Sequence, residues 1–201
     1  MCAGVNKTNH ITYRLLGVDP GTNILGYAVL EIRQNEPHIL EIDVIHLKKY
    51  ENQQEKLHQI FQQLDVIIKN FQPNHMAIEA PFFGKNVQSM LKLGRAQGVA
   101  IAAAMTNNIP ITEYSPKKIK QSVTGNGNAS KEQIAGLLSN MFKATLQDHY
   151  YDATDALAIA LCHFYQSKNI VISTQKNKPK KVKGSNWATF VAQNSDKIIK
   201  P

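Results

Sequence analysis

The first part of the chain carries the apolar pattern of β-strands. Residues 13–19 and 26–32 are short apolar runs, and residues 37–47 alternate apolar with polar side chains. Pro20-Gly21 separates the first two runs, and only short turns join all three. Strands joined in this way form an antiparallel meander. The pattern therefore predicts three consecutive antiparallel strands.

The rest of the chain alternates between helical and strand patterns. Apolar residues in 57–71 follow the spacing of an amphipathic helix, and the pattern predicts short strands at 75–79 and 109–114. A long helix is expected at 86–107, and its second half is apolar on every side, which is typical of a helix buried all round or lying in a subunit interface. Ser115-Pro116 and the capping box that begins at Ser130 each predict a helix start, and a last helix is expected at 152–166.

Length and charge suggest one domain with a basic tail. The chain has 201 residues and a net charge of +8, and residues 168–201 contain eight lysines and one acid. We expect an N-terminal extension at 1–12, a globular domain at 13–168 and a flexible basic tail at 169–201. Since most of the basicity lies in the tail, a nucleic-acid footprint on the domain must be a local patch. Without a membrane-length apolar run, a signal pattern or metal-spaced cysteines, the chain is expected to be cytoplasmic.

Four carboxylates stand where predicted elements begin or end. Asp19 and Glu79 each end a predicted strand, and Asp152 and Asp155 share one face of the last helix. Taken singly, three of them have a plainer explanation: Asp19 suits the turn at Pro20-Gly21, and Asp152 and Asp155 could simply cap the last helix or pair with its dipole. If the four converge, their mutual repulsion requires cations, and hard oxygen ligands select Mg²⁺ or Mn²⁺. Two such ions can clamp the attacking and leaving oxygens of a phosphodiester.

Several motifs together closely resemble RuvC-type crossover (Holliday) junction endodeoxyribonucleases. The resemblance spans residues 14–164 in the right order and spacing. The specific blocks are Leu91-Lys92-Leu93-Gly94-Arg95-Ala96-Gln97-Gly98-Val99-Ala100 and Asp152-Ala153-Thr154-Asp155-Ala156-Leu157-Ala158. They are joined by Gly17-Val18-Asp19-Pro20-Gly21-Thr22, Gly26-Tyr27, Ala77-Ile78-Glu79, Phe82, Lys85-Asn86, Glu113-Tyr114, Val123 and Gly125. The residues at the two ends of the chain match nothing in the family pattern.

The resemblance implies a ribonuclease-H-like α/β fold with a mixed five-stranded sheet flanked by helices. It implies a homodimer that nicks opposite strands of four-way junction DNA, using two Mg²⁺ or Mn²⁺ ions at each active site, and that works with a branch-migration helicase complex. By position, Asp19, Glu79, Asp152 and Asp155 match the metal-binding carboxylates of the family. Lys120 and Lys131 match its DNA-contacting basic residues, Phe82 matches its base-stacking aromatic, and the helix at 86–107 matches its dimer helix. We add Lys85, Lys117 and Lys118 as basic residues near the expected site that could hold a polyanion.

Other interpretations compete with this one. Asp19-Pro20-Gly21-Thr22 also resembles the first phosphate loop of actin-like and sugar-kinase ATPases, but the chain is too short for two large domains and has no second such loop. A non-catalytic junction-binding module would be expected to lack a carboxylate, and all four are present. Another ribonuclease-H-like resolvase with a different substrate is disfavoured by the block at 91–100. Phe83 could equally pack into the core, and His149 is more typical of a surface residue than of a catalyst.

Overall fold

The computed structural model describes residues 12–80, 86–144, 146 and 151–176, with side chains described as far as residue 168. Its centre is a five-stranded sheet in the order β3-β2-β1-β4-β5. The strands are β1 (Tyr13–Asp19), β2 (Ile24–Arg33), β3 (Glu36–His46), β4 (His75–Glu79) and β5 (Ile111–Tyr114). The first three are antiparallel, whereas β4 lies parallel to β1 and β5 lies parallel to β4. The predicted meander and mixed sheet are therefore confirmed.

Five helices are present in the described ranges. They are α1 (Gln53–Phe71), α2 (Val87–Thr106), α3 (Pro116–Thr124), α4 (Lys131–Phe142) and α5 (Tyr151–Lys176). The chain divides into two compact units, Met1–Ser167 and Lys168–Pro201, and the packing and the site described below belong to the first. The proposed boundaries of the domain, extension and tail stay predictions.

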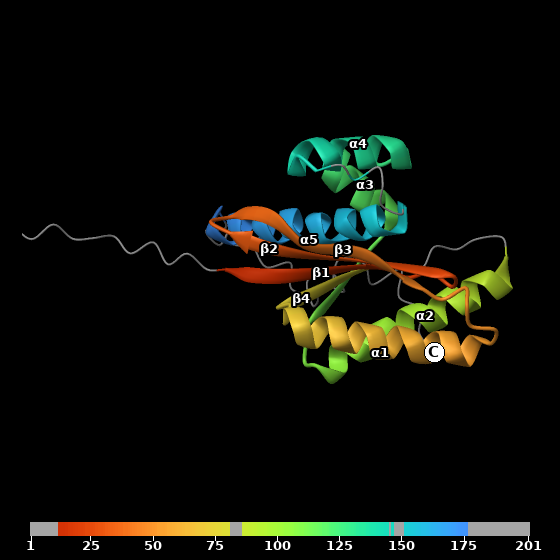
Figure 1. Cartoon of the computed structure of the whole chain (residues 1–201). Coiled ribbons are helices and arrows are strands. Elements are labelled where there is room, and N and C mark those ends of the chain that lie inside the picture. Colours follow the sequence, from red (N-terminus) through yellow and green to blue (C-terminus); the bar gives the residue numbers. More distant parts are fainter. Residues whose placement is uncertain (1–11, 81–85, 145, 147–150, 177–201) are drawn as a thin grey trace, which may run out of the picture. The chain divides into compact units, whose positions relative to one another are not determined.

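The two faces of the sheet are covered by different helices. α1 and α2 lie against one face, and α5 lies against the other with α3 and α4 stacked beyond it (Figure 1). Each face has its own apolar core, one including Leu16, Ile60 and Ala100 and the other including Leu15, Ile134 and Leu157. The alternation of neighbouring Leu15 and Leu16 between the two cores shows why β1 reads as a continuous apolar run, because a central strand is buried on both faces.

Local signals account for the helix ends. Ser115 caps α3 with proline in the first turn, and Ser130 and Gln133 form the capping box of α4, as predicted. Asn52 caps α1, which therefore begins at Gln53, four residues before the first apolar position of its pattern. Asn86 and Asn107 flank α2, in agreement with the expected range.

Some predicted boundaries were wrong. β2 begins at Ile24 and ends at Arg33, β3 runs from Glu36 to His46, and β5 begins only at Ile111. α5 continues to Lys176, ten residues beyond the expected end, and so includes the start of the segment expected to be a flexible tail. No proline or glycine, the residues that most often end helices, occurs between Tyr151 and Lys176.

α2, whose second half was expected to be buried all round or to lie in a subunit interface, is open along one side. The buried residues of α2 are Ala96, Gln97, Ala100, Ala103 and Ala104. On its other side Val87, Leu91 and Met105 are 57–66% exposed. A Cβ atom built at Gly94 or at Gly98 would meet nothing within 4 Å. Complete burial within one copy of the chain is therefore wrong, and the alternative, a subunit interface, stays open.

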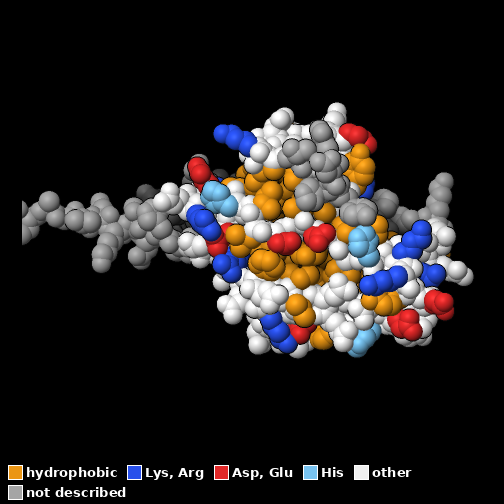
Figure 2. All heavy atoms as spheres, viewed as in Figure 1, with side chains coloured by type: hydrophobic (Ala, Val, Ile, Leu, Met, Phe, Trp, Pro, Cys, Tyr) orange, Lys and Arg blue, Asp and Glu red, His pale blue; other side chains and the backbone are white. Residues whose placement is uncertain are grey.

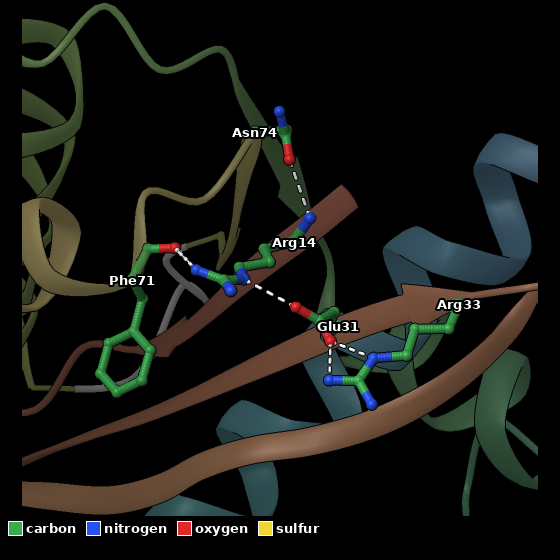
Figure 3. Close-up of polar contacts among 5 residues, drawn as sticks. All are labelled: Arg14, Glu31, Arg33, Phe71 and Asn74. Atoms are coloured by element: carbon green, nitrogen blue, oxygen red, sulfur yellow. Dashed lines mark hydrogen bonds and ion pairs between the residues drawn. The ribbon is translucent and has the colours of Figure 1, made fainter. Parts of the chain in front are cut away.

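A buried ion-pair network holds the end of the sheet opposite the carboxylates. Glu31 on β2 is 4% exposed and accepts hydrogen bonds from the guanidinium groups of Arg14 on β1 and Arg33 (Figure 3). Arg14 also donates to the carbonyl oxygen of Phe71, and its backbone N–H donates to the Asn74 side chain. These contacts join β1, β2 and the connection between α1 and β4.

Basic side chains form no continuous field on the face of the molecule seen in Figure 2. Lys and Arg lie there in small separate groups with acidic side chains between them. Among the residues described, no helix is both long enough and apolar enough to cross a membrane.

Candidate active site

The parallel pairing of β1 and β4 places two carboxylates at one edge of the sheet. The register aligns Val18 with Ile78, and Asp19 and Glu79 are the next residues of the two strands. Parallel strands end at the same edge, so their final side chains are neighbours. This arrangement turns two isolated strand-end acids into a candidate pair.

Two glycines bring the start of α5 against this edge. A Cβ atom at Gly17 on β1 would collide with the carbonyl oxygen of Ala156, and one at Gly26 on β2 would collide with that of Asp152. The backbone of α5 therefore lies closer to the sheet than any side chain at these positions would allow. This close approach places the first turn of α5, with Asp152 and Asp155, beside the end of β1.

A cavity of about 270 Å³ forms where these elements meet. Its charged wall residues are Asp19, Glu79, Asp155, Lys120 and Lys131, and its apolar ones are Pro116, Ile119, Ile134 and Ala158. Three of the four predicted carboxylates thus share one cavity. Asp152 is not part of the wall, although its charge contributes to raising the pKa of Asp19.

Burial and repulsion from neighbouring acids raise the pKa values of Asp19 and Glu79. Burial, with the charges of Glu79, Asp155 and Asp152, raises the pKa of Asp19 to about 8. Burial, together with Asp155, raises the pKa of Glu79 to about 7. A nearby positive charge would oppose the repulsion between the carboxylates, as Lys131 already does for both Asp19 and Glu79.

Two lysines supply positive charge to the same cavity. Lys131 Nζ at the start of α4 lies 2.6 Å from Asp155 Oδ2. Burial alone would lower the pKa of Lys131, but its hydrogen bond and charge pairing with Asp155 outweigh burial and raise it. Lys120 Nζ on α3 donates to the carbonyl oxygen of Ala129 at 2.8 Å, and its charge lowers the pKa of Glu79 against the larger opposing effects.

The donor set fits a hard divalent cation in its chemistry. Carboxylate oxygens are the ligands that Mg²⁺ and Mn²⁺ prefer, and four carboxylates lie close enough to affect one another electrostatically. Within the described ranges, however, no three Asp, Glu, His or Cys side chains converge closely enough to form a ready ligand set. The ligand roles of Asp19, Glu79, Asp152 and Asp155 therefore stay proposals.

The remaining predicted residues fall into two groups. Lys117 and Lys118 are exposed in the first turn of α3, which directly follows β5 at the carboxylate edge of the sheet. Phe82, Lys85, Phe83 and His149 lie outside the described residues. Their assigned roles stay predictions.

Sequence reasoning overlooked three residues that shape the site. Gly17 and Gly26 appeared only as parts of motifs, although they allow the close approach of α5. Gln97 was assigned no role, yet its buried amide donates to the backbone carbonyl of Glu79. A glutamine within an otherwise apolar helix face was the available signal, because buried polar groups require partners.

Comparisons with known proteins place the chain in a family. The model of the family described as crossover junction endodeoxyribonuclease RuvC matches residues 15–163. The chain is 50% identical over 193 residues to the protein of that name from Cytophaga hutchinsonii, covering 96% of this chain and 92% of that protein.

Solved structures of the family share the fold. The Thermus thermophilus RuvC structure superposes with a TM-score of 0.71 at 27% identity, covering 78% of this chain and 96% of that chain. The T. thermophilus RuvC structure in complex with a Holliday junction substrate gives a TM-score of 0.70 at 25% identity, with the same coverage. The expected ribonuclease-H-like α/β fold is confirmed, and the chain belongs to the RuvC family of crossover junction endodeoxyribonucleases.

Proposed function

We propose that this protein resolves four-way DNA junctions by hydrolysing phosphodiester bonds in paired, symmetric nicks, as part of recombination and DNA repair. The observation that carries the proposal is the cavity shared by Asp19, Glu79 and Asp155 with Lys120 and Lys131, in a chain of this family. Clustered carboxylates, of which Asp19 and Glu79 have raised pKa values, suit a site that handles cations and a phosphate together when ammonium groups lie beside them.

The proposal includes two Mg²⁺ ions per site, for which Mn²⁺ would substitute. Asp19, Glu79, Asp152 and Asp155 would hold them. When bound, such ions activate a water molecule and stabilise the leaving oxygen of the phosphodiester. The protein contributes the fixed positions of the four acids at the ends of β1 and β4 and at the start of α5.

The lysines have a different task in this proposal. Lys131 and Lys120 face the cavity and would attract the scissile phosphate while limiting repulsion among the acids. Lys117 and Lys118 are exposed at the adjacent edge and would contact phosphates further along the DNA. Lys85 and Phe82 keep their proposed roles in DNA contact and base stacking.

We further propose that two copies associate through α2. Val87, Leu91, Gly94, Gly98, Ile101 and Met105 recur at alternating intervals of four and three residues along this helix. That spacing places them on one stripe, and it is the spacing by which paired helices interlock. The open space at Gly94 and Gly98 would allow a second helix to approach closely. A dimer with two sites would explain symmetric nicking of a symmetric substrate.

Two elements of the proposal rest on family membership alone. These are the coupling to a branch-migration helicase complex and the cytoplasmic location. No residue described here bears on either.

The test is incubation with a synthetic four-way junction and Mg²⁺, with products resolved on a denaturing gel. We expect two nicks at symmetric positions, strict dependence on the divalent ion, and little cutting of a linear duplex of the same sequence. Equal cutting of duplex and junction would contradict the proposal. Tight junction binding with no cutting in Mg²⁺ or Mn²⁺ would instead favour the non-catalytic module.

A further inference from the structure

Gln97 is a buried polar side chain that joins α2 to the carboxylate edge of the sheet. It is 7% exposed on a helix face that is otherwise formed by alanines. Its side-chain Nε2 donates to the backbone carbonyl oxygen of Glu79 at 3.2 Å and to Glu113 Oε2 on β5 at 2.8 Å. One amide group thus contacts the last residue of β4 and a neighbouring strand.

β1 offers no backbone N–H group that could donate a hydrogen bond to the carbonyl oxygen of Glu79. The paired register of β1 with β4 ends at Val18 and Ile78. The residue that follows Asp19 is Pro20, which has no N–H to offer. On the β5 side, the next backbone donor along β4, Ala80 N–H, bonds to the Tyr114 carbonyl. Gln97 therefore secures the end of β4 at the residue whose side chain lines the cavity.

We propose that Gln97 is a positioning residue, which holds the backbone of Glu79 against α2 and so sets where the Glu79 carboxylate stands for metal binding. This inference rests on the proposed metal-dependent function. Fixing the backbone of a ligand residue matters because a metal site requires its ligands at definite positions. Mutation of the groups that hold ligands in place typically weakens metal binding by about 10- to 100-fold. The same helix bears the apolar stripe of the proposed dimer, so α2 links the two features.

Three variants separate this role from simple packing. Gln97→Met keeps an unbranched side chain of similar length but removes both hydrogen bonds. Glu113→Leu removes only the bond between Gln97 and β5 and leaves the bond to Glu79. Gln63→Met is the control for the substitution itself, because Gln63 on α1 is a half-buried glutamine whose Nε2, like that of Gln97, donates to a side chain, Gln59 Oε1.

The first measurement is calorimetric titration of Mn²⁺ into the full-length protein without DNA. We expect Gln97→Met to bind Mn²⁺ about 10-fold more weakly, and Glu113→Leu and Gln63→Met to bind within about twofold of the unmodified protein on the same scale. The second is single-turnover junction cutting against Mg²⁺ concentration. The Mg²⁺ concentration for half-maximal rate should rise for Gln97→Met by a larger factor than the maximal rate falls.

The outcomes are distinguishable. Unchanged Mn²⁺ affinity in folded Gln97→Met would overturn the inference, as would an equal loss in Glu113→Leu. If Gln97→Met melts below the assay temperature, Gln97→Asn takes its place with the same expectation, because it keeps a buried amide but is one methylene shorter. If the unmodified protein neither binds Mn²⁺ nor cuts junctions, the proposed function fails. If the unmodified protein and Gln97→Met bind Mn²⁺ and cut junctions equally well, only the role of Gln97 is refuted.

Discussion

The ammonium nitrogen of Lys131 lies 2.6 Å from Oδ2 of Asp155, so a cation carried by α4 pairs with an acid on α5 at the edge of the cavity. The Lys131 side chain is 55% exposed and that of Asp155 is 18% exposed. The pair therefore lies between cavity and solvent, where it can neutralise the acids and still meet a phosphate.

Lys131→Met should impair cutting more than folding. Loss of a positive group beside the scissile phosphate is expected to slow cutting by about 100-fold, while loss of a partly exposed ion pair costs only about 1 kcal/mol or less. Cutting rates and thermal melting check both parts. The control is Lys69→Met, since Lys69 pairs with Asp65 at the same 2.6 Å and with similar exposures of 65% and 20%, away from the cavity. Equal effects of the two substitutions on cutting would refute a role for Lys131.

Asp19→Asn should abolish cutting and change how stability depends on pH. Loss of one charged ligand is expected to slow cutting by at least about 100-fold. Since the folded-state pKa of Asp19 is raised to about 8, ionisation destabilises the metal-free protein progressively as pH rises from about 4 to about 8. Asparagine removes this penalty, so in EDTA the variant should melt above the unmodified protein at pH 8 and close to it at pH 4.5.

Binding gives an independent check on the same variant. Without divalent metal, Asp19→Asn should bind a junction at least as tightly as the unmodified protein, because one negative charge facing the phosphate is gone. Added Mg²⁺ should raise the melting temperature of the unmodified protein more than that of the variant. A fully active variant would restore the plain interpretation of Asp19 as a turn residue.

Leu91→Asp should separate the proposed dimer. A carboxylate placed in an apolar interface loses its hydration without gaining a partner, which strongly opposes association. Light scattering should then report one chain rather than two, and paired nicking should become uncoordinated. Val66→Asp on α1 is the control, because Val66 is 55% exposed and Leu91 57%. A mass unaffected by Leu91→Asp would exclude α2 as the interface.

A stacked histidine pair should make the fold sensitive to acid. The rings of His75 and His163 lie 4.1 Å apart between centroids, and Tyr114 Oη lies within hydrogen-bond distance of His163 Nδ1. Burial, with the nearby His75, lowers the pKa of His163 to about 4. A base with a lowered folded pKa contributes stability that is complete above the unfolded value near 6.5 and is lost as pH falls towards 4.

His163→Gln should flatten this part of the pH profile. The difference in unfolding free energy between pH 7 and pH 4 should shrink by less than the roughly 3 kcal/mol that the whole pKa difference would give, because the His163 ring is only partly buried and solvent screens its charge. Asp19 and Glu79 have the opposite effect, since their raised pKa values make stability fall as pH rises. This effect is present in the unmodified protein and in the variant, so it cancels when the two are compared at each pH. Identical slopes between pH 4 and 6.5 would mean that His163 does not titrate in this range.

Glu31→Gln should destabilise the fold without affecting chemistry at the cavity. Glu31 accepts hydrogen bonds from both Arg14 and Arg33 (Figure 3). The hydrogen bond from Arg14 and the interactions with Arg33 lower the pKa of Glu31, although burial acts to raise it. A neutral amide cannot pair with two guanidinium groups. The melting temperature should fall by more than in Glu36→Gln, an exposed control on β3. Cutting at a permissive temperature should be unchanged in both variants.

The sequence by itself determined the element types, most boundaries and the candidate acids. Strand and helix periods, Ser-Pro and the capping box are local signals, and local signals remain readable without knowledge of the fold. The acids were found because each follows an apolar run or opens a helix. The end of α5 at Lys176 was placed wrongly, because no local stop signal marks it in the sequence.

Only the tertiary structure decided which acids meet and what holds them. Asp19 and Glu79 are neighbours because β1 and β4 pair in parallel across a long stretch of sequence, and Asp155 joins them because Gly17 and Gly26 admit the backbone of α5. Packing between distant elements likewise decides three other features. These are the ion pair of Lys131 with Asp155, the hydrogen bond from Gln97 to the Glu79 carbonyl, and the open side of α2. Periodicity reports which side of an element is apolar, whereas contacts between elements depend on register and distance, which no local pattern encodes.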